Sequence, residues 1–408
     1  MGLFNRKPRR EDSGDDGSTP ENKKEKGGWR RPANTAFKQQ RLKAWQPILT
    51  PKTVLPTFFI IGLLFGPIGG LLIWGSSLVS EMTFDYSQCE NLEASTQNGS
   101  YTFSDVPSYS YRLRSSDSGV APPKPQMALL NNTGNASVTD VSQELQCILQ
   151  FSVPRDLEPS VFMYYKLTNF YQNHRRYVKS LNSDQLKGDY VSTSDLDSSD
   201  CKPLGTRDGK AIYPCGLIAN SLFNDTFSSP VLLNPTNDTP STVYEFSSNN
   251  IAWSGEAKKY ATTPIGDGGY SSLEDIVPPP NWMKRFPNGY NDTNPPPNLK
   301  EDLHFQNWMR TAGLPTFTKL YGRNDADTMV AGTYQIVIGL NFPVLPYKGT
   351  KSVVITTVSW IGGKNPFLGW AYVAAAALFV LLAVVGTARH LIKPRRLGDM
   401  TLLSWNRT

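Results

Sequence analysis

Histidine and cysteine are scarce in this chain, which contains three histidines and four cysteines among 408 residues. The sequence also lacks a G-x-x-x-x-G-K-[ST] phosphate-binding loop, an H-E-x-x-H zinc motif and a G-x-S-x-G nucleophile elbow. No cysteine belongs to a C-x-x-C pair, the spacing typical of structural zinc sites. We therefore expect no catalytic residues, no metal site and no bound cofactor.

Acidic and basic residues are absent from two long apolar segments, Thr53 to Ser80 and Phe367 to Ala388. A helix of about 20 residues crosses a hydrocarbon core of about 30 Å, so each segment is long enough to span a membrane. Pores and proton relays need polar or ionisable groups at membrane depth, and these segments carry no charge. We expect two transmembrane helices that anchor and pack rather than conduct ions.

Basic residues flank the outer ends of both apolar segments, whereas acidic Glu81 and Asp85 follow the first one. Short flanks rich in lysine and arginine remain in the cytosol, which predicts cytosolic termini and a lumenal or extracellular loop. The first segment is expected to act as a signal anchor, because the polar head before it is too long for a signal peptide. The basic residues are Lys38, Arg41, Lys43, Lys52, Arg389, Lys393, Arg395 and Arg396.

The chain is therefore expected to have six parts. Its first residues are polar and charged, and such a segment cannot bury enough apolar surface to fold. The predicted parts are a disordered cytosolic tail at 1–33, a juxtamembrane segment at 34–52, a transmembrane helix at 53–80, an ectodomain at 81–366, a second transmembrane helix at 367–392 and a cytosolic tail at 393–408.

Sequons for N-linked glycosylation are concentrated in the predicted ectodomain. Asn234 is excluded because Pro235 follows it, and Asn406 lies in the cytosolic tail, where it should remain unmodified. We expect N-linked glycans on several of the candidate asparagines in the ectodomain. These candidates are Asn98, Asn131, Asn135, Asn224, Asn237 and Asn291.

All the cysteines also fall in the predicted ectodomain, and their number is even. In an oxidising compartment this pattern predicts two disulfides, for which three connectivities are possible. The sequential pairing closes the shortest loops and has the lowest entropic cost of closure. It joins Cys89 to Cys147 and Cys201 to Cys215.

Gly62, Gly66 and Gly70 recur at four-residue spacing in the first apolar segment. Small residues at this spacing share one helix face and allow the backbone of another helix to approach closely. We interpret these three glycines as helix-packing residues.

The ectodomain is expected to be mainly β. Several runs are rich in β-branched and aromatic residues and are bounded by proline or glycine, which is typical of strands. Two helices are predicted among them, at 168–181 with Asn169 and Gln172 as a capping box, and at 302–311 with Phe305, Trp308 and Met309 on one face. An antiparallel β-sandwich with a few short helices is the predicted fold. The predicted strands are 148–153, 161–167, 333–340 and 352–360.

Six stretches of the chain together resemble one family. This family comprises the non-catalytic subunits of type-IV P-type ATPases, the phospholipid flippases, and includes the cell-division-control and ligand-effect-modulator proteins. The sequences of the first and fourth stretches are similar to those of the fungal cell-division-control member. The stretches are FKQQRLKAWQPILTP, VFMYYKLTNFYQNHRRYV, YPCGLIANSLFNDTF, VPPPNWMKRFPNGY, FQNWMRTAGLPTFTKLYG and GGKNPFLGWAYV.

The resemblance implies an accessory subunit with a glycosylated, disulfide-bonded β-sandwich on two membrane spans. The cysteine pairs match those of fungal members, whereas additional cysteines of the animal relatives are absent here. Asn224 matches a family glycosylation position. The implied partner is the ATPase catalytic subunit, which holds the phosphorylated aspartate and the lipid path. The implied role is to chaperone that subunit from the endoplasmic reticulum to the Golgi, endosomes or plasma membrane and to support its transport cycle.

Two other functions compete with this interpretation. A two-span channel subunit, similar to purinergic or epithelial sodium channels, would share the topology, but such proteins are cysteine-rich and have polar pore residues. A lipid-binding receptor or ectoenzyme on a hairpin anchor would not co-purify with a larger ATPase. Membrane lipids are expected neighbours of the chain, and nucleic acid is not an expected partner. The sequence does not identify the ATPase or the lipid.

Overall fold

The computed structural model describes residues 35–42, 49–95, 101–135, 137–138, 140–234 and 242–394. The predicted tail at 1–33, most of the predicted tail at 393–408, and the sequons at Asn98 and Asn237 lie outside these residues.

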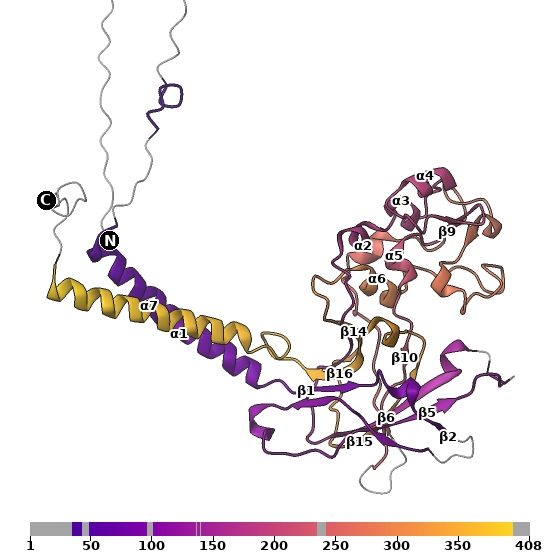
Figure 1. The fold of residues 1–408 in the computed structure, drawn as a ribbon, viewed down its shortest axis with the longest axis horizontal. Coiled ribbons are helices and arrows are strands. Elements are labelled where there is room, and N and C mark those ends of the chain that lie inside the picture. The colour runs from indigo at the N-terminus through magenta and orange to yellow at the C-terminus, as the bar shows by residue number, and fades with distance from the viewer. Residues whose placement is uncertain are drawn as a thin grey trace, which may run out of the picture.

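Two long helices project side by side from a mainly β ectodomain (Figure 1). They are α1, Pro51–Ser77, and α7, Phe367–Ile392. Both are long and apolar enough to cross a membrane. Helix α1 ends before Ser80 because that residue already pairs with the ectodomain. The amide of Ser80 donates to Thr357 Oγ1 at 3.0 Å, and its carbonyl accepts from the amide of Thr357 at 3.0 Å.

A five-stranded antiparallel sheet lies nearest the membrane helices and has the order β14-β7-β16-β1-β4. Its central strands β1 and β16 connect directly to α1 and α7, so the sheet continues the hairpin into the ectodomain (Figure 1). The strands are β1 Glu81–Asp85, β4 Tyr109–Arg112, β7 Val161–Leu167, β14 Phe317–Asn324 and β16 Lys351–Thr357.

A second sheet has eight strands in the order β12-β11-β15-β6-β5-β2, with β10 also paired to β15 and β3 to β5. All its pairs are antiparallel except β2 with β5. Its strands are β2 Ala94–Ser95, β3 Ser104–Asp105, β5 Gln126–Asn131, β6 Leu145–Val153, β10 Thr226–Phe227, β11 Val231–Leu232, β12 Thr242–Val243 and β15 Gly332–Gly339.

The two sheets pack face to face and form the predicted sandwich. Side chains on β1 and β7 alternate between buried and partly exposed positions, which places one face of each strand against the core. The ring of Phe84 on β1 lies 4.8 Å from that of Phe151 on β6, measured between centroids. The mainly β, two-helix fold expected from the sequence is confirmed, and each of the four predicted strands corresponds to an observed one.

A smaller lobe of short helices lies beside the sandwich (Figure 1). It contains α2 Arg175–Lys179, α3 Ser183–Leu186, α4 Thr193–Ser198 and α5 Leu217–Asn220. A three-stranded sheet, β13-β9-β8, joins them through β8 Thr206–Arg207, β9 Lys210–Ile212 and β13 Ile276–Val277. The 3-10 turns are Cys89–Asn91, Ser115–Asp117, Val141–Gln143, Glu256–Lys259, Leu273–Asp275, Pro280–Trp282 and Leu345–Tyr347.

One predicted helix forms only in part, and the other is correct. The segment predicted as a helix at 168–181 is helical only in α2, because its first residues bond to distant segments. Asn169 has a positive φ of 55° and donates to the carbonyl of Tyr347 at 2.8 Å, so it does not cap a helix. By contrast, α6, Leu303–Met309, forms within the predicted 302–311 segment, and Asp302 caps it by accepting from the amide of Phe305.

Candidate functional site

Helices α1 and α7 pack through glycines at which their backbones nearly touch. A Cβ atom added to Gly62 would lie 2.6 Å from Val380 Cγ2 and 3.2 Å from the carbonyl oxygen of Ala376. One added to Gly69 would lie 2.9 Å from the carbonyl oxygen of Gly369. Such close approach maximises van der Waals contact between membrane helices. Larger side chains at these positions would separate the hairpin.

Gly66 and Gly70 face away from α7, and a Cβ atom added to either would meet nothing within 4 Å. Only Gly62 of the three predicted packing residues therefore contacts the second helix. Gly69, which the four-residue spacing did not select, contacts α7 in their place. Seven residues make about two helical turns, so the Gly62 to Gly69 spacing was the available sequence signal.

An apolar groove with a volume of about 440 Å³ lies at Gly66, one of these open glycines. It is formed almost entirely by α1, with Val380 as its one lining residue from α7. The groove exposes backbone at Gly66 between larger apolar side chains, which provides a close-packing surface for another helix. The lining residues are Phe59, Ile60, Gly62, Leu63, Gly66, Pro67 and Val380.

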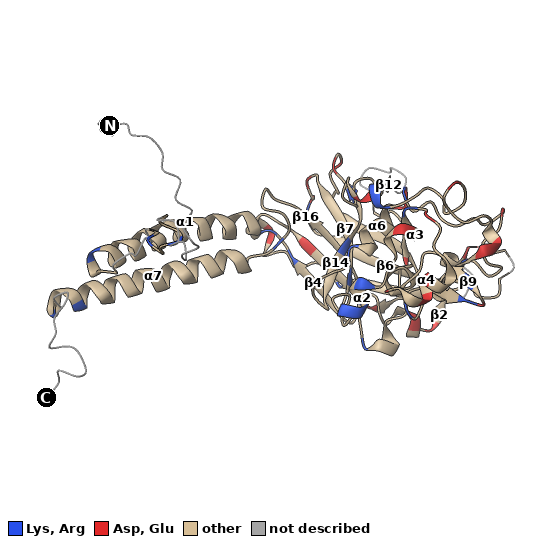
Figure 2. Ribbon diagram, turned by 90° about the horizontal axis from the view of Figure 1, so that it is seen from above, with Lys and Arg blue, Asp and Glu red and all other residues tan. Residues whose placement is uncertain are grey.

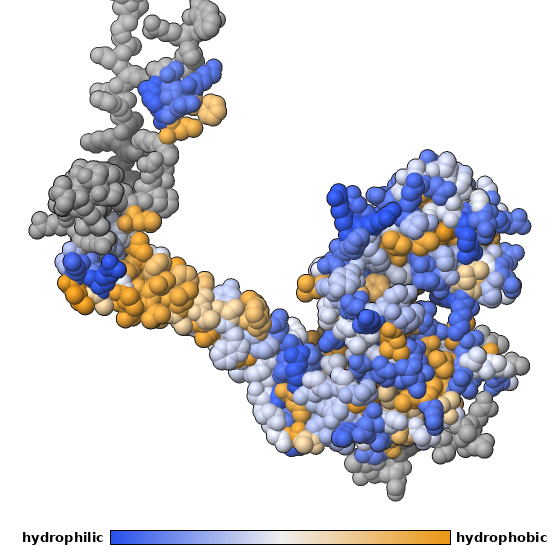
Figure 3. Space-filling model, in the orientation of Figure 1, coloured by the Kyte–Doolittle hydropathy of each residue, from blue (hydrophilic) through white to orange (hydrophobic). Residues whose placement is uncertain are grey.

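Charge is distributed along the molecule as a membrane protein requires. Blue lysine and arginine residues mark the ends of α1 and α7 that lie away from the ectodomain, and the helices between are uncharged (Figure 2). Most of the visible hairpin surface is hydrophobic and becomes paler toward the ectodomain, whereas the ectodomain surface is largely hydrophilic (Figure 3). These features describe an integral membrane protein with an ectodomain on one side.

The ectodomain is fixed to the hairpin by contacts where α7 begins. Lys364 Nζ donates to the carbonyl of Val79 at 2.7 Å and to the carbonyl of Leu113 at 3.0 Å. The Trp360 indole packs against Gly75, where an added Cβ atom would lie 3.0 Å from Nε1. Partial burial and the charge of Arg112 lower the pKa of Lys364, although Glu81 opposes this. These contacts couple the orientation of the sandwich to that of the membrane helices.

Two tryptophans from different parts of the chain hold α5 in place. The Trp282 indole donates to the carbonyl of Ala219 at 3.0 Å, and the Trp308 indole donates to the carbonyl of Ile218 at 2.9 Å. Each carbonyl also accepts a local bond at 3.2 Å, Ala219 from the amide of Leu222 and Ile218 from Ser221 Oγ, so the indoles add a second donor that ties α5 to distant segments. Three of the quoted stretches, those containing Trp282, Trp308 and Ile218, therefore meet at one place.

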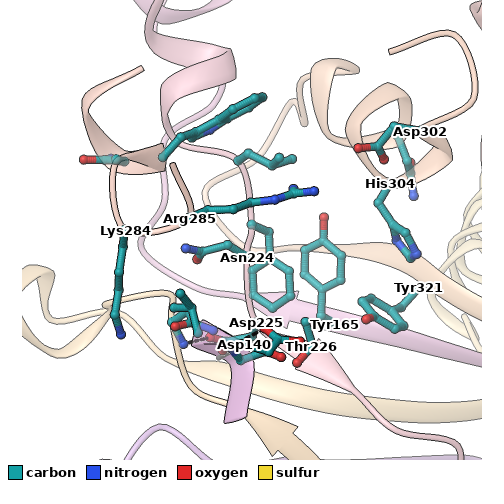
Figure 4. Close-up of a pocket in the computed structure, with 18 of the residues that line it drawn as sticks. Asp140, Tyr165, Asn224, Asp225, Thr226, Lys284, Arg285, Asp302, His304 and Tyr321 are labelled. Atoms are coloured by element: carbon teal, nitrogen blue, oxygen red, sulfur yellow. Dashed lines mark hydrogen bonds between the residues drawn. The ribbon is translucent and has the colours of Figure 1, made fainter. Parts of the chain in front are cut away.

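A cavity of about 570 Å³ lies beside this junction, between the sandwich and the lobe of short helices (Figure 4). Asn224, Lys284 and Arg285 lie on one side of it in this view, and Asp302, His304 and Tyr321 lie on the other, with Tyr165 between them. Burial lowers the pKa of His304, although Asp302 opposes the shift, so the imidazole is favoured in its neutral form. The lining residues come from four of the quoted stretches and from flanking segments. They are Asp140, Val141, Ser142, Tyr165, Leu222, Phe223, Asn224, Asp225, Thr226, Asn281, Trp282, Lys284, Arg285, Asp302, His304, Asn307, Leu320, Tyr321 and Asn341.

A buried ion pair supports the floor of this cavity. Lys351 Nζ lies 2.8 Å from Asp225 Oδ2, and the two side chains are 1% and 0% exposed. Tyr86 donates to Asp225 Oδ2 at 2.9 Å, while the amides of Asn341 and Phe342 donate to Oδ1. Complete burial, followed by the nearby Asp225 carboxylate, raises the pKa of Tyr86 well above its usual value. The carboxylate is thus surrounded by donors, as a buried charge requires.

Comparison with known proteins places the chain in a family. Residues 72–396 match the LEM3 (ligand-effect modulator 3) family / CDC50 family. The chain is 40% identical to the phospholipid-transporting ATPase accessory subunit CDC50 of Chaetomium thermophilum, over 98% of this chain and 97% of that protein. It belongs to the CDC50/LEM3 family. It is also 40% identical to the phospholipid-transporting ATPase accessory subunit CRF1 of Saccharomyces cerevisiae, over 92% of this chain and 89% of that protein. The identity to cell cycle control protein 50A of Bos taurus is likewise 40%, over 87% of this chain and 88% of that protein.

The two disulfides of this CDC50/LEM3-family protein lie in different parts of the ectodomain. Cys89 is joined to Cys147 within the sandwich, and Cys201 is joined to Cys215 within the lobe of short helices. This is the sequential pairing that closure entropy favours. Each bond therefore stabilises one structural part.

The described sequon asparagines of this CDC50/LEM3-family protein lie at the surface or close to it. Asn131, Asn135 and Asn224 are exposed, and Asn291 is partly buried. At Asn131, Asn135 and Asn291, the side-chain oxygen accepts a bond from the backbone amide two residues later, which leaves the amide nitrogen outward. Asn224 makes no such bond, since it leads into strand β10. Asn131 and Asn135 lie in adjacent turns at the end of β5, whereas Asn224 and Asn291 belong to other segments.

Within the described residues, no group of three or more histidine, cysteine, aspartate or glutamate side chains could hold a metal ion. His174 is exposed beside two arginines, and His304 donates to or accepts from Ser248 Oγ at 3.1 Å.

Proposed function

We propose that this chain is the accessory subunit of a phospholipid-transporting type-IV P-type ATPase, with which it forms a heterodimer. The observation that carries the proposal is the similarity to named ATPase accessory subunits over nearly the whole chain, from the membrane helices through the ectodomain. The chain itself is not an enzyme and holds no cofactor. ATP hydrolysis and the lipid path belong to the partner.

The proposed contact in the membrane is the groove on α1. Its apolar walls and exposed glycine backbone suit a transmembrane helix of the catalytic subunit, because small residues permit close approach where no hydrophobic force drives association. The rigid connection through Lys364 then positions the ectodomain over the lumenal loops of that subunit. A subunit that contacts a partner in several places stabilises some states of its cycle over others.

The proposed topology places both termini in the cytosol and the ectodomain in the lumen of the secretory pathway. The basic ends of α1 and α7 support this orientation (Figure 2). N-linked glycans are then attached at the ectodomain sequons, while Asn406 remains bare. The subunit accompanies its ATPase from the endoplasmic reticulum toward the Golgi, endosomes or plasma membrane. Peptide mapping that found sugar on Asn406 would contradict this topology.

The deciding experiment is functional reconstitution. The catalytic subunit is produced alone and together with this chain, and its export, lipid-stimulated ATP hydrolysis and lipid transport are measured. We expect loss of export first, and reduced turnover in the catalytic subunit that survives. A catalytic subunit that folds, leaves the endoplasmic reticulum and transports lipid normally by itself would contradict the proposal and favour a receptor on a hairpin anchor.

The groove is tested by adding side-chain volume to it. Gly66→Leu fills the groove from a position where an added Cβ atom meets nothing within 4 Å, so we expect weaker co-purification with the catalytic subunit and an intact hairpin. Ala377→Leu adds a similar volume at an exposed small residue of α7 outside the groove and serves as the matched control. Equal co-purification of the Gly66→Leu variant and the unmodified chain would exclude the groove as the contact.

A further inference from the structure

The cavity beside Asn224 has the composition of a site for a neutral, polyhydroxylated ligand. Its volume of about 570 Å³ lies within the range of about 300–1,000 Å³ typical of small-molecule sites. Cations and acids both line it, and Lys284 already pairs with Glu144 at 2.8 Å. A phosphate would meet Asp140 and Asp302 as well as the cations, so the mixed charge disfavours an anion.

Several polar groups in the cavity lack a hydrogen-bond partner among the described residues. Tyr165 is only 4% exposed, and its hydroxyl makes no hydrogen bond there. Asn341 Oδ1 is buried and also has no partner. The Arg285 guanidinium contacts the ring of Phe286, yet it donates no hydrogen bond to a described residue. Buried polar groups are rarely left unpaired, so Asn341 Oδ1 indicates an occupant that can donate a hydrogen bond. The Tyr165 hydroxyl and the exposed Arg285 guanidinium line the same cavity and provide donors to such an occupant.

The asparagine of a sequon stands at this cavity. Asn224 and Thr226 are exposed, whereas Asp225 between them points inward to the buried Lys351. The ion pair therefore fixes the direction of the Asn224 side chain, which lines the cavity (Figure 4). The side-chain amide of Asn224 makes no hydrogen bond to a described residue. In the other described sequons, by contrast, the side-chain oxygen of the asparagine accepts a bond within a turn.

We propose that this cavity is a carbohydrate subsite for the chain's own glycan, in which the first N-acetylglucosamine units attached to Asn224 are bound. Each unit carries hydroxyls and an acetamide, which can donate to Asn341 Oδ1 and accept from the Tyr165 hydroxyl and from Arg285. The apolar face of the sugar ring packs against the aromatic walls at Phe223 and Trp282. Tethering keeps the effective concentration of the sugar high, so modest contacts suffice.

The subsite rests on the proposed lumenal placement of the ectodomain, and its failure is distinguishable from failure of that placement. A cytosolic ectodomain would carry no sugar at any sequon. A lumenal ectodomain without the subsite would carry an Asn224 glycan that is as accessible as the others.

The test is site-resolved deglycosylation of the folded, full-length protein in mild detergent. An endoglycosidase that cuts between the first two N-acetylglucosamine units is added, and peptide mass spectrometry follows cleavage at Asn224, Asn131 and Asn291 over time. We expect the glycan at Asn224 to be cleaved about tenfold more slowly than the glycans at Asn131 and Asn291. This is the effect of one or two net hydrogen bonds that must break before the enzyme can reach the sugar. After denaturation all three sites should be cleaved at similar rates. Equal rates in the folded protein, or an unoccupied Asn224, would overturn the proposal.

Two variants identify the contacts. Tyr165→Phe removes only the unpaired hydroxyl and retains the ring stacked 3.9 Å from Phe223, so it should accelerate release at Asn224 but not at Asn291. Tyr164→Phe makes the same change at the neighbouring residue, which points to the opposite face of β7, and should change neither rate. Acceleration by both variants, or by neither, would contradict the assigned contact.

Discussion

Replacing Lys351 by methionine removes the cation that pairs with the buried carboxylate of Asp225 at 2.8 Å. Methionine preserves much of the length and apolar volume of the lysine side chain. It removes the bond from Nζ to the carbonyl of Phe342 at 2.8 Å and the cation–π contact with Tyr86 at 5.3 Å. Asp225 then remains buried with donors from Tyr86 and two backbone amides, but without a counter-charge.

The expected cost follows from this geometry. Breaking a buried ion pair on one side typically costs about 3–5 kcal/mol, and the remaining donors around Asp225 favour the lower end. A domain of this size loses about 2 °C in melting temperature for each kcal/mol, so we expect the Lys351→Met variant to melt about 6 °C lower. The double variant, Asp225→Asn with Lys351→Met, removes both charges, and the asparagine oxygen can still accept from the backbone amides. It should therefore be more stable than the single variant.

The assay is thermal unfolding of the full-length protein in detergent, followed by intrinsic tryptophan fluorescence. Lys300→Met is the control, because Lys300 is exposed and the substitution is the same. A Lys351→Met variant that melts with the unmodified protein would refute the reasoning. A double variant no more stable than the single one would show that lost packing, rather than an unpaired charge, causes the destabilisation.

Three further predictions follow from other parts of the molecule. Gly69→Leu should lower the melting temperature of the protein, because its side chain would collide with α7. Gly70→Leu should not, because an added Cβ atom there meets open space. Equal effects of the two variants would contradict the assigned hairpin contact. Lys364→Met leaves the partly buried carbonyls of Val79 and Leu113 without their donor. Each lost partner should lower the free energy of unfolding by about 1–3 kcal/mol. Hydrogen exchange should therefore become faster where the hairpin meets the sandwich. Burial raises the pKa of Tyr177 to about 12, whereas the pKa of an unfolded tyrosine is about 10. The neutral phenol therefore stabilises the fold below pH 10. This contribution is lost as the pH rises from about 10 to 12. Alkaline titration by tyrosinate absorbance should show ionisation of buried tyrosines lagging behind that of the denatured chain, and coincident curves would contradict their burial.

Local patterns were sufficient where a segment is governed by its own residues. The membrane helices follow from uncharged apolar runs, and β7 matches its predicted limits because its alternate residues Val161, Met163 and Tyr165 all face the core. Helix α6 was also predictable, since Asp302 caps it and Gly313 with Pro315 limits it.

Tertiary contacts overrode the local pattern in the segment after β7. Its spacing of apolar residues favours a helix at 168–181, but Gln172 accepts a bond from the amide of Ala312 at 2.8 Å, and the amide of Phe170 donates to the carbonyl of Pro315. The backbone amide of Phe170 and the side-chain oxygen of Gln172 are thus bonded to a segment some 140 residues away, and this holds residues 170 and 172 outside a regular helix. No window of local sequence contains that information.

The sequence by itself determined that this protein has two membrane-spanning helices around a large β ectodomain, and its quoted stretches indicated the family. Only the tertiary structure decided that Gly62 and Gly69 hold the hairpin while Gly66 and Gly70 remain open, because the direction of a helix face depends on where its neighbour packs. The cavity beside Asn224 was likewise decided by the fold. Its walls come from segments that lie far apart in the sequence, and their contact depends on the packing of the sandwich against the short-helix lobe.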